Sequence, residues 1–485
     1  MKGYSYLAIP CIALAAAVVQ ASVQPVQAFA LPSKASQQTP IGKNRAHASS
    51  SSLAAASVAA SDGDIPRGGN GGGSSSFEGG QATIPNEVFN LVKSIVGSGV
   101  LSLPYGVAAF GNAPSALIPA VAITTIMGGL SAYTFGMIAR VCRETNTMSY
   151  ADAWDASVGK RTAPLIAFSC FFDCFAGALS YSMILADTAV NLFKASGIAV
   201  GRTPALLTIT TFILLPLCLM KNLNSLAPFS LVGIISMLYI TLAMGVRWLG
   251  SAYAPGGTYF ASQLVEPVFG AAGAKSALSF KVLILTCMLT NAYIAHFNAP
   301  KFLAELKDNT MGRFNKVIAW SFGISIALYA AATSFGFLTF GSVSNGFILN
   351  NYSVKDKLMS LASIAVTISI TTSYPLIFVG ARDGMLDLFR IPQEKRDNSI
   401  LNKVTLGILG AATLLASQLT DLGMVASVGG ATFGTALVFV YPAIMFLKQQ
   451  KGKRTAETIP AALIGCLGVV MGVIGTYFSL SGVEL

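Results

Sequence analysis

The chain has 485 residues, of which 53% are hydrophobic and only 11% are charged. Soluble domains carry about 25% charged residues, so this composition excludes an ordinary water-soluble protein. Two histidines and seven scattered cysteines give no ligand set at zinc spacing, and the net charge of +11 is spread between apolar runs instead of along one face. We therefore expect a membrane protein with no metal or other cofactor and no nucleic-acid partner.

Residues 1–28 have the layout of a secretory signal peptide. Met1–Tyr6 carries one lysine, Leu7–Val19 is apolar, and small residues follow near Ala21 and Ala28. The apolar core of about 13 residues is too short for a comfortable membrane span.

Residues 29–61 are rich in Ser and Ala, contain Lys34, Lys43 and Arg45, and lack Asp and Glu. This composition is typical of an organelle transit peptide. The two signals in series resemble the bipartite targeting sequences of algae with complex plastids, which predicts a location in the plastid envelope. The alternative is an ordinary secretory signal followed by a disordered tail, with the vacuole or plasma membrane as destination. Residues 62–85, rich in Gly and Ser, are expected to form a flexible linker.

Apolar runs follow one another from residue 86 onward. An apolar helix of about 20 residues crosses the hydrocarbon layer, whereas a membrane β-barrel would show alternating strands of about ten residues. The predicted spans are residues 86–112, 114–140, 162–193, 204–220, 224–249, 280–303, 314–340, 357–381, 402–420, 422–447 and 459–480. The sequence therefore predicts an all-α membrane protein with about eleven transmembrane helices.

The distribution of basic residues in the connecting loops supports this count. With eleven spans, eighteen Lys and Arg residues fall on one side of the membrane and seven on the other. Short loops on the cytoplasmic side are enriched in Lys and Arg, so the first span is expected to start on the positive side. A missed or additional span in the middle would scramble this alternation.

The first predicted span contains two glycines, two serines and a proline between Ile95 and Pro104. A Gly-Ser-Gly cluster at mid-span favours an unwound helix, and unwound backbone at membrane depth survives only where it lines a cavity. Close helix packing through small residues is the alternative. We expect substrate contacts from the residues at this break, which are Ile95, Val96, Gly97, Ser98 and Gly99.

Two further spans carry polar candidates. Asp173 lies inside the third span, and an intramembrane carboxylate is a functional hypothesis by default. It could carry a coupled proton or pair with Lys93, or lie nearer the surface. Thr371 and Thr372 lie in the eighth span, where hydroxyl groups can contact substrate or ion, although helix packing explains them equally well.

The sixth span has a second interruption, a cluster of polar side chains from Thr290 that ends at Pro300. We expect substrate contacts here from Asn291, Tyr293 and Ile294. His296 could relay protons, or it could brace the break as a buried, hydrogen-bonded side chain.

The first and sixth spans occupy corresponding positions in two halves of five spans, as in transporters built from inverted repeats. A zwitterionic amino acid suits such a site, because N–H groups at a half-helix start attract its carboxylate and exposed carbonyls accept from its ammonium.

Several motifs resemble those of the amino acid/auxin permease family. The first-helix signature corresponds to Asn90–Tyr105, and further motifs are Ala295–Phe302, Gly336–Gly341, Ser373–Leu376, Val428–Thr435 and Tyr441–Pro442. The resemblance implies that residues 86–485 form an amino acid transporter domain. It also implies a LeuT-like 5+5 inverted repeat with broken helices 1 and 6, and sodium- or proton-coupled transport.

Lys93 bears on the coupling ion. Sodium-coupled animal members of the family tend to carry Asn in its place, whereas Lys at this position resembles plant members of the family. A fixed ammonium would compete with sodium or could itself titrate. Coupling to H⁺, or exchange, is therefore expected in preference to coupling to Na⁺. The alternative is that Lys93 snorkels to the headgroups.

The sequence thus predicts a secondary active transporter of small, neutral amino acids that works by alternating access. An amino acid sensor with the same fold is the alternative. A channel or an enzyme is disfavoured, because neither pore-lining rings nor a catalytic constellation occurs. The expected partners are the amino acid substrate and the lipid bilayer, and no protein partner can be inferred.

Overall fold

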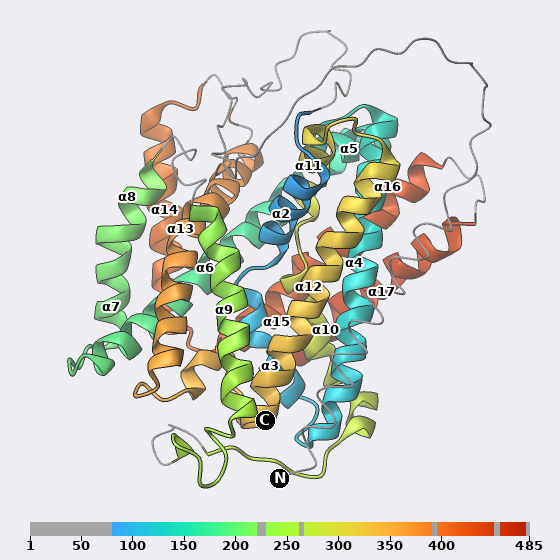
Figure 1. Ribbon diagram of the computed structural model, residues 1–485. Helices are drawn as coiled ribbons and strands as arrows, with labels where there is room; N and C mark the ends of the chain where they lie inside the picture. Colours follow the sequence, from blue (N-terminus) through green and yellow to red (C-terminus); the bar gives the residue numbers. More distant parts are fainter. Residues whose placement is uncertain are drawn as a thin grey trace, which may run out of the picture.

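A computed structural model describes residues 80–220, 229–260, 266–389, 391, 395–450 and 456–481 of the chain. These residues are almost entirely helical, and the described part contains two isolated β-bridges but no strand (Figure 1). The predicted signal and transit peptides lie outside the described residues, as do residues 62–79 of the predicted linker.

Every predicted span has a helical counterpart. Within the described residues, ten helices are long and apolar enough to cross a membrane, and one bent pair brings the number to eleven. The bent pair is the first span, made of α2 (Ile84–Ile95), the short helix η1 (Ser98–Ser102) and α3 (Leu103–Ala108). Its halves meet at 45°. The prediction of an all-α protein with about eleven spans is confirmed.

The other spans run in chain order. They are α4 (Leu117–Thr145), α6 (Ala163–Ala195), α7 (Arg202–Ile209) continued by η4 (Thr210–Leu214) and α8 (Leu215–Leu219), α9 (Phe229–Leu249), α10 (Val282–Ala292) with η8 (His296–Asn298) and α11 (Ala299–Glu305), α12 (Met311–Phe340), α13 (Lys357–Leu388), α14 (Asn398–Gln418), α15 (Leu422–Gly429) continued by η11 (Gly430–Gly434), η12 (Ala436–Val440) and α16 (Tyr441–Gln449), and α17 (Thr458–Leu480). A short helix outside the membrane, α5 (Tyr150–Ser157), joins the second span to the third.

The packing follows the symmetry of two five-span halves. The third span, α6, packs along its counterpart α13, and the second span, α4, packs along its counterpart α12. The two broken spans, α2–α3 and α10–α11, lie inside the bundle, whereas α7, α8 and α14 lie at its edge (Figure 1). The arrangement is the predicted LeuT-like 5+5 repeat with broken helices 1 and 6.

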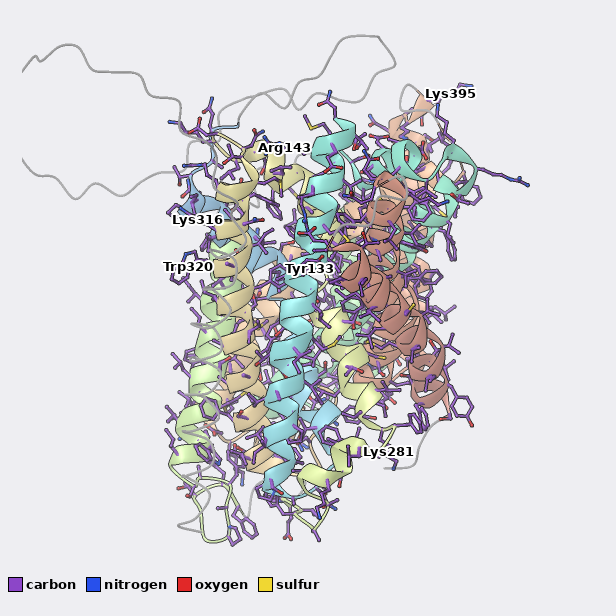
Figure 2. The ribbon with its side chains drawn as sticks, turned by 90° about the vertical axis from the view of Figure 1, so that its right-hand side faces the viewer. Tyr133, Arg143, Lys281, Lys316, Trp320 and Lys395 are labelled. Atoms are coloured by element: carbon purple, nitrogen blue, oxygen red, sulfur yellow. The ribbon has the colours of Figure 1, made fainter. Side chains whose placement is uncertain are left out.

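Charged and apolar side chains divide the surface as a bilayer requires. Arg143, Lys316 and Lys395 gather at one end of the bundle, which we call the positive end, and Lys281 lies at the other (Figure 2). Large apolar side chains between the ends face outward, among them Trp320, which is 54% exposed. Outward-facing apolar side chains suit lipid contact.

The first span begins at the positive end, tied to the end of the sixth span. Gly80 donates its N–H to the carbonyl of Ala304, and Ala82 exchanges backbone hydrogen bonds with Glu305 and Lys307. α2 then starts at Ile84, with the Thr83 hydroxyl accepting from a first-turn N–H. Residues 80–85, the last six of the predicted linker, therefore form backbone that is hydrogen-bonded to the sixth span or continues into α2.

An ion pair between a partly exposed arginine and a buried aspartate fixes the opposite end. The Arg247 guanidinium of α9 donates to both carboxylate oxygens of Asp356, at 2.8 and 2.6 Å, and the Tyr253 hydroxyl donates to the same carboxylate at 3.0 Å. Asp356 also caps the N-terminus of α13 by accepting from the N–H groups of Leu358 and Met359. Burial and the negative charge of Asp356 raise the pKa of Tyr253, which therefore remains a donor.

Replacement of Asp356 by alanine should destabilise the protein strongly, because it leaves Arg247 without its partner and α13 without its cap. We expect a loss of about 3 kcal/mol in the free energy of unfolding, measured by thermal unfolding in detergent. Asp397→Ala is the matched control, because Asp397 caps α14 while exposed to solvent and its loss should cost only about 1 kcal/mol. Equal destabilisation by both substitutions would contradict this account of the network.

Candidate functional site

A cavity lies at the centre of the bundle, between the two broken spans. The space between its lining residues measures about 670 Å³ when its open mouth is included. We call it the central cavity. It is lined by Ser94, Ile95, Gly97, Ser98, Gly99, Ser102, Asp173, Gly177, Ser180, Tyr181, Ile184, Asn291, Ala292, Ile294, Ile377, Leu422 and Ala426.

The break in the first span forms one wall of the cavity. Val96 (φ −80°, ψ 86°) and Gly97 (φ −106°, ψ −164°) leave the helical conformation, and the chain becomes helical again at Ser98. The first N–H groups of a helix have no partner within that helix. Here they belong to Ser98 and Gly99, which both line the cavity. The wall thus offers backbone donors at the start of a half-helix.

The break in the sixth span forms the facing wall. α10 ends at Ala292, and helical structure resumes at His296. Asn291, Ala292 and Ile294 line the cavity. The carbonyl groups at the end of a helix lack partners within it, so this wall can offer acceptors. The two breaks are also linked nearer the positive end, where the Asn298 amide donates to the Ser94 hydroxyl at 3.1 Å.

One tyrosine of α12 joins the two breaks. The Tyr329 hydroxyl lies 2.7 Å from the carbonyl oxygen of Ile95 and 2.8 Å from that of Ala292. A hydroxyl has a single proton, so it donates to one of these carbonyls at a time. Tyr329 is fully buried, which keeps water from replacing it. It therefore offers a donor to one carbonyl group from each helix, at the places where the helical hydrogen bonding is interrupted.

An aromatic layer backs the sixth-span break on the side away from the cavity. Tyr293 donates to the carbonyl of Thr124 at 3.1 Å, and its ring centroid lies 4.8 Å from that of Tyr329. The His296 Nε2 lies 3.0 Å from the Thr134 hydroxyl and 3.1 Å from the Ser131 carbonyl, both on α4. Both side chains are fully buried and do not line the cavity. They hold the broken helix against α4.

Asp173 brings the one carboxylate into the lining of the central cavity. It lies on α6, one turn before Gly177, with Ser180 and Tyr181 a further turn along the same face. No hydrogen bond or ion pair to Asp173 is present among the described residues. A carboxylate in this place can bind a proton or attract a cationic group of a ligand.

Most of the predicted substrate residues meet at the cavity. Ile95, Gly97, Ser98, Gly99, Asn291 and Ile294 line it together with Asp173, whereas Val96 and Tyr293 point elsewhere. Of the predicted ion-coupling residues, Lys93, His296, Thr371 and Thr372 are absent from the lining. Lys93 lies in the last turn of α2, and the Thr372 hydroxyl donates back to carbonyls of its own helix. Their part in coupling stays a prediction.

Sequence analysis missed three features of the cavity. Tyr181 projects from α6 to within 3.5 Å of where a Cβ on Gly97 would lie. Leu422 and Ala426, at the start of α15, add an apolar wall toward the end opposite the positive end. Tyr329 supports both breaks from behind. Only the one-turn spacing from Asp173 to Gly177 and Tyr181 could have suggested that one face of α6 looks into the site.

The sequence matches a family model along almost its whole described length. The model, described as "Transmembrane amino acid transporter protein", covers residues 80–481. The chain belongs to the transmembrane amino acid transporter family. This confirms the resemblance drawn from its motifs, and the chain is a multi-pass membrane protein of that family.

Curated relatives within this family are distant but cover most of the chain. "Putative sodium-coupled neutral amino acid transporter 11" of Danio rerio is 24% identical over 82% of this chain and 86% of its own. Amino acid transporter AVT6B of Arabidopsis thaliana is 24% identical over 84% and 91%. Vacuolar amino acid transporter 2 of Saccharomyces cerevisiae is 20% identical over 80% and 81%. All are named as transporters, in agreement with the expectation that the chain is not an enzyme.

The fold of this family member is also found in solved structures. The manganese transporter of Eremococcus coleocola superposes with a TM-score of 0.53 at 13% identity, over 83% of this chain and 88% of its own. The likeness shows a shared fold alone. Within the described residues, no group of three or more His, Cys, Asp or Glu side chains is arranged to hold a metal ion.

Tyr329→Phe should impair transport while leaving the protein folded, because it removes the hydroxyl donor that the Ala292 carbonyl shares with the Ile95 carbonyl. We expect the initial rate of amino acid uptake to fall at least about tenfold, as for loss of a buried hydrogen bond of a few kcal/mol. Tyr477→Phe is the matched control, because Tyr477 on α17 is 67% exposed. Uptake by Tyr329→Phe equal to that of the control would show that the bridge is dispensable.

Proposed function

We propose that the chain is a secondary active transporter of small, neutral amino acids that works by alternating access. The observation that carries the proposal is that the two broken helices border one cavity at the centre of the bundle. Broken helices at corresponding places in two repeats form the substrate site in transporters of this construction. Residues 86–485 would then constitute the transport domain.

The walls of the central cavity suit the two charged groups of an amino acid. Backbone donors at Ser98 and Gly99 would bind the α-carboxylate, because the start of a half-helix favours negative charge. The end of α10, near Asn291, would accept hydrogen bonds from the α-ammonium. The missing side chain of Gly97 leaves the backbone open on the side of Tyr181, and that of Gly99 lets the first break lie close to Ala292 of α10.

The remaining walls favour a small, uncharged side chain. Ile184, Ile377, Leu422 and Ala426 supply apolar surface around the cavity, and the printed name of the Danio rerio relative refers to neutral amino acids. Asp173 would repel an acidic substrate. A basic substrate would gain from Asp173 but would lose contact with water at an apolar wall.

We propose that transport is coupled to protons, or is an exchange of amino acids, and is not coupled to sodium. Asp173 faces the cavity and can bind a proton there. Lys93 lies in the last turn of α2, three residues before Val96. Its positive charge would repel a sodium ion bound near the break. His296, Thr371 and Thr372 stay candidates for relay or ion contacts.

We propose the plastid envelope of a complex-plastid alga as the location, on the composition of residues 1–61. A fusion of residues 1–60 to a fluorescent protein should enter plastids in such cells. Accumulation in the reticulum or vacuole instead would favour the ordinary secretory signal.

Purified protein in liposomes provides the test of function. Radiolabelled alanine, glutamine and leucine should enter faster with an imposed pH gradient, or exchange with unlabelled amino acid inside. Lysine and glutamate serve as basic and acidic comparisons. If no amino acid is taken up or exchanged, the transporter proposal fails, and binding without movement would favour the sensor.

Gly97→Leu should abolish uptake, whereas Gly97→Ala should retain it. A Cβ at position 97 would lie 3.5 Å from the Tyr181 hydroxyl, an ordinary contact, while the rest of a leucine side chain must enter the cavity. Both variants should reach the membrane in similar amounts, measured by quantitative blotting. Normal uptake by Gly97→Leu would undo the assignment of the cavity as substrate site.

Lys93→Asn should make transport responsive to sodium, because it removes a positive charge near the break. Uptake in liposomes is compared with Na⁺ or choline outside, for the wild type and the variant. Lys281→Asn, at the opposite end of the bundle, controls for loss of a lysine. An ion response that Lys93→Asn leaves unchanged would count against the blocking charge.

A further inference from the structure

A carboxyl group is enclosed at the positive end of the first span. Glu87 of α2 is 0% exposed. Neither of its carboxyl oxygens has a hydrogen-bond partner among the described residues. It lies one turn after Thr83, where residues 80–82 pair with the end of α11 (Figure 1). Glu87 does not line the central cavity.

The charged groups around Glu87 do not neutralise it. α11 brings Lys301 and Glu305, which pair with each other at 3.8 Å while both stay exposed. On α12, Arg313 is engaged with the carbonyl of Lys307, and Lys316 is exposed. The described side chains of α9, from residue 232 to 246, include no charged group. Lys93, on α2 itself, lies almost two turns farther along the helix.

An ionised carboxylate in these surroundings is very costly. Moving a charge out of water without hydrogen bonds or a paired ion costs far more than burying a neutral hydroxyl group. The N-terminus of a helix such as α2 stabilises a negative charge by about 1 kcal/mol at an exposed site. This is too little to compensate for the cost of burying the ionised carboxylate. A bound proton removes the charge, so Glu87 is neutral while this end of the span is packed.

We propose that Glu87 is a proton-binding site of the transport cycle. Substrate release at the positive end requires α2 to move away from α11 and α12 there, because residues 80–82 pair with the end of α11 and α2 packs along α12. Separation brings water to Glu87, and the carboxyl group then loses its proton to that side. Closure requires a proton to return. The inference rests on the proposed transporter function and assigns the coupled proton to a gate outside the substrate site.

Two assays on the full-length protein in liposomes separate the gate from transport itself. Exchange of radiolabelled alanine without a gradient reports substrate binding and movement, and uptake driven by a pH gradient reports coupling. Glu87→Gln keeps the shape of the side chain but cannot release a proton. We expect exchange within about twofold of the wild type and loss of the stimulation by the pH gradient.

Control variants make the result specific. Glu144→Gln removes an exposed carboxylate at the positive end and should retain the gradient response. Asp173→Asn tests the cavity carboxylate in the same assays. If Glu87→Gln keeps the full gradient response, the inference is overturned, whether or not Asp173→Asn loses it. If the wild type neither exchanges nor accumulates any amino acid, the proposed function itself has failed.

A spectroscopic measurement covers the case in which Glu87→Gln does not transport at all. Infrared difference spectra of wild type and Glu87→Gln in lipid at neutral pH should show a protonated carboxyl C=O band that the variant lacks. Absence of such a band from the wild type would overturn the inference independently of transport.

Discussion

Hydrogen-bonding of unwound backbone at membrane depth is the constraint on which this structure depends. Two helices stop at the middle of the bundle, and no bulk water is available there to partner the carbonyl groups that they expose. The Tyr329 hydroxyl lies within hydrogen-bond distance of one such carbonyl from each helix, Ile95 and Ala292. A single side chain of α12 therefore holds the two breaks side by side and leaves their opposite faces open to the cavity.

The division of labour around the breaks follows from this arrangement. On one side, Tyr293 and His296 anchor the sixth span to α4 through buried hydrogen bonds. On the other side, Gly97 and Gly99 leave the backbone accessible, and Asp173 supplies a carboxylate. Rigid support behind a polar, accessible wall is what a site needs if it is to bind and release a small zwitterion repeatedly.

The fold could be predicted almost completely from the sequence, because membrane spans depend on long apolar runs and on the side to which basic residues fall. The breaks could be predicted as well, since Gly97-Ser98-Gly99 and the polar cluster before Pro300 interrupt those runs. Corresponding places in the two halves then indicated a shared site.

Contacts between distant residues could not be predicted in this way. The sequence gives no register between α12 and the broken helices, so Tyr329 resembles any tyrosine in an apolar run. His296 stood equally for relay and brace, and only its contacts with Thr134 and Ser131 place it behind the break. Glu87 lies at a predicted span edge, where a carboxylate is ordinary. It becomes unusual only because residues 80–82, expected to be linker, pair with the end of α11.

The central claim is that the two broken helices form the substrate site. Its most direct test is whether a bound amino acid protects a cysteine at the break from chemical modification. A cysteine at position 98, introduced as Ser98→Cys, would be modified with a small thiol reagent and followed by mass spectrometry of the peptide that contains it. The account predicts that a transported amino acid slows this modification and leaves that of Lys281→Cys unchanged. An unchanged rate at position 98 with saturating amino acid would contradict it.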